Sequence, residues 1–108
     1  MANTFKLKTK ANVGVTTSNV YAVPSATTTV VIGVTLANTS GSSINVGVGI
    51  TRASTDDIHL MKNVPIHQGS SFEFMGGNKI VLETTDILTV KSDVNNSLDV
   101  ALTIMEIT

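Results

Sequence analysis

Residues Thr27–Thr51 read TTTVVIGVTLANTSGSSINVGVGIT and contain two arms in which apolar side chains alternate with small or polar ones. The alternating apolar positions are Val30, Ile32, Val34 and Leu36 in the first arm and Ile44, Val46, Val48 and Ile50 in the second. Because successive side chains of a β-strand point to opposite faces, this period of two predicts two strands, each with one apolar face. Asn38–Ser43, between the arms, is rich in residues that favour turns. The stretch therefore predicts a long β-hairpin at the centre of a sheet.

The rest of the chain repeats this pattern in shorter runs. Turn signals separate the runs every six to twelve residues or so, and one of them, Gly76–Asn78, has the composition of a tight hairpin turn. No segment of useful length has the period of a helix. We therefore expect an all-β fold in which residues 1–108 form one domain, an antiparallel β-sandwich of the jelly-roll or Ig-like type with about eight or nine short strands.

The composition limits the classes of partner. Charged residues make up 14% of the 108 residues and the net charge is -1, so there is no strong field to attract nucleic acid or a membrane surface. The polar residues are mainly uncharged, with 16 Thr, 10 Ser and 9 Asn. Hydroxyls and amides cost less to desolvate than ionised groups, so such a surface can be buried against another protein. The alternative is a sandwich whose polar surface simply faces solvent.

Few residues have the makings of a chemical site. The sequence contains no cysteine, and His59 and His67 lack enough carboxylates at ligand spacing to predict a metal site. Asp56–Asp57 could bind calcium weakly, but further oxygen ligands are missing nearby, which favours a solvated loop. No nucleophile motif or phosphate-binding glycine loop is present. We expect no catalytic residue, no metal and no cofactor, and therefore not an enzyme.

Two segments are candidates for contacts with partners. In the first ten residues Lys6, Lys8 and Lys10 share one face, which is typical either of a protected sheet edge or of a basic arm that docks on an acidic neighbour. The final strand is apolar on one face throughout and on both faces in its last third. Such an end is expected to be buried between layers or between subunits. The interface candidates in this strand are Ala101, Thr103, Met105, Ile107 and the terminal Thr108.

The chain resembles small structural proteins of tailed-bacteriophage particles. The likeness is carried by Val20–Pro24, Thr28–Gly33, Leu36–Asn38, Gly76–Glu83 with Asp86, and Ile104–Thr108. It implies a non-enzymatic virion subunit present in many copies and assembled in the host cytoplasm. Within that class the expected function is a capsid decoration or cement protein. Its expected partners are copies of itself, as a homo-oligomer such as a trimer, and the major capsid protein or other virion proteins.

The alternative function is a structural or receptor-binding module of the tail, baseplate or fibre. A receptor-binding module would bind carbohydrate, and sugar sites normally use exposed aromatic rings for stacking. Tyr21 is the only Tyr, and Trp is absent, which makes this alternative weaker. Deleting the last five residues is expected to abolish assembly and to leave the monomer folded.

Overall fold

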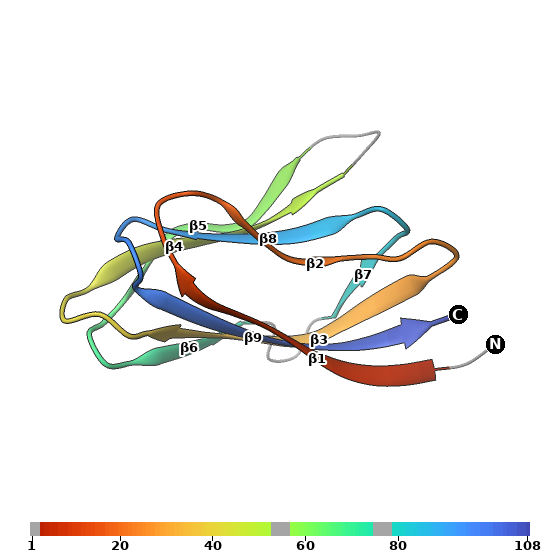
Figure 1. Cartoon of the computed structure of the whole chain (residues 1–108), viewed down its shortest axis with the longest axis horizontal. Coiled ribbons are helices and arrows are strands. Elements are labelled where there is room, and N and C mark those ends of the chain that lie inside the picture. The colour runs from red at the N-terminus through yellow and green to blue at the C-terminus, as the bar shows by residue number, and fades with distance from the viewer. Residues whose placement is uncertain (1–2, 53–56, 75–78) are drawn as a thin grey trace.

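The computed structural model describes residues 3–52, 57–74 and 79–108. The described residues form nine strands and no helix, in two antiparallel sheets packed face to face (Figure 1), so the predicted β-sandwich is confirmed. The strands are β1 (Asn3–Val13), β2 (Ser18–Ala22), β3 (Thr28–Asn38), β4 (Ile44–Thr51), β5 (Ile58–Ile66), β6 (Ser71–Phe74), β7 (Ile80–Leu82), β8 (Ile87–Ser92) and β9 (Leu98–Ile107).

The order of the strands is that of a jelly roll. The first sheet, sheet A, has the order β1-β9-β3-β6, with β7 also paired to β3. The second sheet, sheet B, has the order β2-β8-β4-β5. The chain crosses between the sheets at most of its connections, and the first and last strands lie side by side in sheet A (Figure 1). This arrangement decides between the two types of sandwich that the sequence left open.

The predicted central hairpin is wrong. β3 pairs with β9, β6 and β7 in sheet A, whereas β4 pairs with β8 and β5 in sheet B. Each arm has an apolar face, and the two faces are buried by stacking across the sandwich and not by pairing side by side. The residues between the arms do turn the chain, because the buried Asn38 side chain donates to the carbonyl oxygens of Ser42 and Ile66 at 2.8 and 3.0 Å. This turn carries the chain from one sheet to the other.

The predicted inward face of β3 is wrong at its first two positions. The register of β3 against β9 shifts between Val31 and Gly33, where a β-bulge reverses the alternation of side chains. Val31 is therefore fully buried, whereas Val30 and Ile32, expected in the core, are only partly buried. After the bulge, Val34 and Leu36 point inward as expected. A one-residue shift of this kind changes the face of every side chain on one side of it.

The core lies between the two sheets and contains mainly aliphatic side chains, together with the Tyr21 ring of β2. Its largest fully buried side chains are Leu36, Ile44, Leu82, Leu88, Leu98, Leu102 and Ile104. The described residues contain no helix that is long and apolar enough to cross a membrane. The turn predicted at Gly76–Asn78 lies outside the described residues, and the strands that flank it, β6 and β7, each pair with β3.

A polar cluster of three buried side chains and one exposed lysine joins the sheets at one end of the sandwich. The Tyr21 hydroxyl, on β2 of sheet B, donates to Oε2 of Glu106, on β9 of sheet A, at 2.5 Å. Thr29 Oγ1 lies 2.8 Å from the same hydroxyl and acts as its donor, since the Tyr21 proton is used on Glu106. Lys6 Nζ, on β1, lies 2.8 Å from Glu106 Oε1. We call these four residues the tyrosine cluster.

The tyrosine cluster changes the ionisation of its members. Burial, followed by the hydrogen bond to Glu106, raises the pKa of Tyr21 to about 12. The hydrogen bond from Lys6, followed by the one from Tyr21, holds the pKa of Glu106 below its ordinary value. At neutral pH the cluster therefore contains a neutral phenol and a carboxylate, and its four residues come from β1, β2, β3 and β9.

Candidate interaction surfaces

One row of apolar side chains crosses the outer face of sheet A. Phe5 on β1 is paired with Met105 on β9, Met105 with Val30 on β3, and Val30 with Val81 on β7. Phe5 and Val81, at the two ends, are 69% and 59% exposed, and the two middle residues are half-buried. Neighbouring strands lie about 4.8 Å apart, so this apolar row spans roughly 14 Å. Leu7, also on the outer face and 63% exposed, extends it along β1.

On β1, β9 and β3 the residues beside the apolar row are small or uncharged, whereas at its other end Lys79 and Glu83 flank Val81 along the chain. Four of the predicted interface residues, Ala101, Thr103, Met105 and Ile107, lie on this outer face of β9. Ala101 faces Thr35 on one side and Thr9 on the other. Exposed apolar side chains surrounded by uncharged polar ones are typical of a surface that contacts another protein. Thr108 follows the end of the strand and is exposed.

The predicted lysine candidates lie on the opposite face of sheet A. Lys6, Lys8 and Lys10 pair with the inward-facing residues of β9 and therefore point to the sandwich side of the edge strand β1. Lys6 forms an ion pair with Glu106, and Lys8 Nζ lies 6.0 Å from the centre of the Tyr21 ring. These two contacts are within the chain. The lysines and the β9 candidates therefore lie on opposite faces of sheet A and cannot belong to one flat interface.

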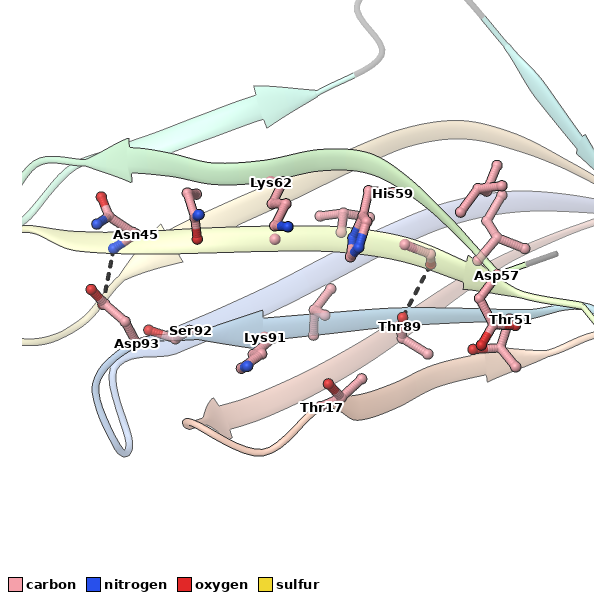
Figure 2. A pocket seen from close by; sticks show the side chains of 17 residues that line it. Thr17, Asn45, Thr51, Asp57, His59, Lys62, Thr89, Lys91, Ser92 and Asp93 are labelled. Atoms are coloured by element: carbon pink, nitrogen blue, oxygen red, sulfur yellow. Dashed lines mark hydrogen bonds between the residues drawn. The ribbon is translucent and has the colours of Figure 1, made fainter.

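Sheet B has a groove on its outer face (Figure 2). Its floor is β4, where Gly47 and Gly49 take the outward positions while Val46, Val48 and Ile50 point into the core. Because glycine has no side chain, the sheet is lower along β4 than along its neighbours β5 and β8. The volume of the groove is about 400 Å³, at the low end of the range for small-molecule sites.

Two lysines and a histidine form the walls of this groove, from two different strands. Lys91 on β8 is paired directly with Gly47. Lys62 belongs to β5, where two residues, Lys62 and Asn63, fall opposite the single Gly47 in a β-bulge, and Asn63 has a positive φ of 55°. His59, also on β5, is paired with Gly49 (Figure 2). Lys62 and Lys91 therefore flank the same glycine from opposite sides.

The two ends of the groove contain carboxylates. At one end Asp93 Oδ1 accepts a hydrogen bond from the Asn45 backbone N–H at 2.9 Å (Figure 2). At the other end, Asp57 lines the groove beside Thr51. Thr89, in the middle, donates its hydroxyl to the Gly49 carbonyl at 3.2 Å. Along its length the groove thus presents a carboxylate, two ammonium groups and a second carboxylate.

The groove was not among the sites expected from the sequence. Of the candidate calcium pair Asp56–Asp57, Asp56 lies outside the described residues. Asp57 lines the groove. His59 lines it as well, whereas His67 is exposed at the end of β5. No group of three or more His, Asp or Glu residues that could hold a metal occurs in the described ranges. The signal that could have found the groove is the alternation of Val and Gly in β4, which predicts a strand with one bare face.

No protein-family model matches the chain, and no curated protein matches it. A solved structure from the Bacillus endospore appendages, described as a family of disulfide-linked pili, is similar with a TM-score of 0.59. The similarity covers 99% of this chain and 87% of that one, at 12% sequence identity. At this identity the likeness shows a shared fold over the whole chain.

Proposed function

We propose that the protein is a non-enzymatic structural subunit that works in many copies and uses the outer face of sheet A as a contact surface. The observation that carries this proposal is the apolar row from Phe5 to Val81. Soluble monomers rarely expose large contiguous apolar patches without a use for them. The fold similarity to an appendage protein described as forming pili agrees with a structural function.

The apolar row can supply useful binding energy to a neighbouring subunit. Burying a Phe side chain fully contributes about 1.5–3 kcal/mol. Since 69% of Phe5 is still exposed, covering it would contribute about 1–2 kcal/mol per contact. The Thr and Ala side chains beside it can be buried without removing a charge from water. The chain has no cysteine, so contacts between copies of it rely on packing and hydrogen bonds.

Within this class we propose a capsid decoration or cement protein of a bacteriophage, in agreement with the resemblance of the sequence. The jelly roll is one of the folds used by viral capsid proteins. Contacts across subunit joints would add binding free energy to the assembled shell and oppose the loss of subunits. The alternative remains a tail, baseplate or fibre component, which would use the same outer face in fewer copies.

The contact surface is tested by Phe5→Asp, which places a charge at the more exposed end of the apolar row. The matched control is Val15→Asp, because Val15 is 47% exposed and lies outside the apolar row. We expect self-association or particle binding of the Phe5 variant to be at least about tenfold weaker. Circular dichroism checks that both variants remain folded. The use of this face would be contradicted if both variants weakened association equally. It would also be contradicted if neither variant weakened association.

A point substitution is preferable to truncation for this test. β9 lies between β1 and β3, and Ile104 near its end is fully buried in the core. Glu106, two residues later, belongs to the tyrosine cluster. Deleting the last five residues would therefore remove part of the fold together with part of the outer face. The folded truncated monomer that the sequence led us to expect is not compatible with this arrangement.

The place in the particle is tested by copy number. Quantitative peptide mass spectrometry of purified particles would compare this protein with the major shell protein. A ratio near that of the shell protein is expected for decoration, and a ratio far below it would move the protein to the tail, baseplate or fibre. Absence from the particles would overturn the virion assignment.

A further inference from the structure

We propose that the groove on sheet B binds an acidic sugar, with the sugar carboxylate held between Lys62 and Lys91 above Gly47. This inference does not depend on the proposed function, because it concerns the other sheet. The groove is the place where three strands bring together residues that are far apart in the sequence: Gly47, Lys62 and Lys91. Their arrangement defines the charge, the size and the polarity of the ligand.

The negative charge of the ligand follows from the two lysines. β5 and β8 lie on either side of β4, so the backbones that carry Lys62 and Lys91 are roughly 10 Å apart. Both side chains line the groove, and each is long enough to reach an anionic group centred above Gly47. Neither lysine forms an ion pair with a carboxylate in the described part of the chain. An ammonium pair of this kind binds an anion by charge-assisted hydrogen bonds.

The ligand is small and carries one charge rather than many. Asp93 and Asp57 lie at the two ends of the groove, where they would repel a polyanion that ran along it. Asp93, at the nearer end, would accept hydrogen bonds from the hydroxyl groups of a sugar whose carboxylate lies between the lysines. Thr17 and Asn45 add further hydroxyl and amide groups to the lining. This pattern fits a polyhydroxylated carboxylate and does not fit a nucleic acid.

A peptide is a poor fit for the same groove. An extended peptide binds a sheet through free backbone groups at an edge strand. β4 is an inner strand of sheet B and is paired on both sides, with β5 and with β8. Recognition above β4 therefore has to use side chains. No Phe, Tyr or Trp lines the groove among the described residues, so stacking of a neutral sugar is not available and the charge becomes the main determinant.

The test is a titration of the isotope-labelled protein with glucuronate, followed by NMR amide shifts. We expect saturable shifts that centre on Gly47 and Lys91, and no saturable response to glucose, which lacks the carboxylate. The double variant Lys62→Gln with Lys91→Gln should weaken glucuronate binding about tenfold or more. Lys10→Gln, an exposed lysine on β1, is the matched control and should leave the affinity unchanged.

A second variant tests the floor of the groove without altering charge. Gly47→Ala adds a Cβ whose closest contact, the Met61 carbonyl oxygen at 3.5 Å, is an ordinary one. The variant should fold and should bind glucuronate more weakly, because the methyl group occupies the proposed carboxylate position. Inorganic phosphate and acetate are the remaining probes. Equal binding of glucuronate and these small anions would overturn the sugar assignment, and so would shifts that centre outside the groove or full affinity in the double lysine variant.

Discussion

Replacing Tyr21 by Phe removes one oxygen atom from the tyrosine cluster and leaves the shape of the side chain unchanged. The lost hydrogen bond is made to a carboxylate, and such bonds contribute about 1.5–3 kcal/mol. Thr29, which is fully buried, also loses its partner. We therefore expect the free energy of unfolding to fall by about 2–3 kcal/mol, which corresponds to a decrease in Tm of roughly 8–15 °C for a chain of this size.

Thermal unfolding followed by circular dichroism at neutral pH measures this effect. Thr29→Val is the matched comparison, since it removes the other hydroxyl of the cluster but leaves the bond between Tyr21 and Glu106. We expect a smaller loss from it, of about 1 kcal/mol. A decrease in Tm below about 3 °C for the Tyr21 variant would refute the reasoning, because that value lies under the contribution of even one ordinary hydrogen bond.

The same residue can be observed directly, because Tyr21 is the only tyrosine and the chain has no tryptophan. The ultraviolet absorbance of tyrosinate should appear with a midpoint of about 12 in the folded protein and near the ordinary value of about 10 in denaturant. Since the folded state keeps the proton that the unfolded state loses, stability should fall as the pH rises from about 10 to about 12. A midpoint near 10 in the folded protein would contradict the buried hydrogen bond.

Two further predictions concern the other end of the pH range and the floor of the groove. The pKa of Glu106 is lowered by Lys6 and then by Tyr21, so its contribution is present above its ordinary pKa and is lost as the pH falls through the folded-state value. Denaturant unfolding should show that the wild type is more stable than Glu106→Gln at neutral pH, and that this difference in stability becomes smaller in acid. A difference in stability that does not depend on pH would count against the ion pair. Gly49→Ala would place a Cβ 2.7 Å from the Ile58 carbonyl oxygen and should lower the free energy of unfolding by about 1–3 kcal/mol. Gly47→Ala makes no such contact and should leave the free energy of unfolding unchanged or slightly higher. Equal losses of stability in the two variants would show that the close approach at Gly49 does not cause the destabilisation.

Part of the candidate surface was readable from the sequence. The alternation in the last strand places Ala101, Thr103, Met105 and Ile107 on one face, and the structure keeps them together on the outside of sheet A. Phe5 and Leu7 also alternate with the lysines as expected. The sequence did not show that Phe5, Met105, Val30 and Val81 form one row, because that depends on the register of four strands. The bulge after Val31, which turns Val30 outward, leaves no mark in the local pattern.

The groove was less predictable for the same reason. The bare face of β4 follows from the Val and Gly alternation, but the two lysines that flank it come from positions 62 and 91. Periodicity tells which residues share a face of a strand and says nothing about which strand lies beside it. The bulge that places Lys62 opposite Gly47 is likewise a property of the paired strands.

A β-sandwich could be predicted from the sequence alone, because a period of two and closely spaced turns are local properties of the chain. The placement of β3 and β4 in different sheets became visible only in the folded chain, since the apolar faces of two strands can be buried within one sheet or between two. It also decided that Tyr21 meets Glu106, 85 residues away. Such contacts depend on strand order and register, which arise from the packing of the whole core.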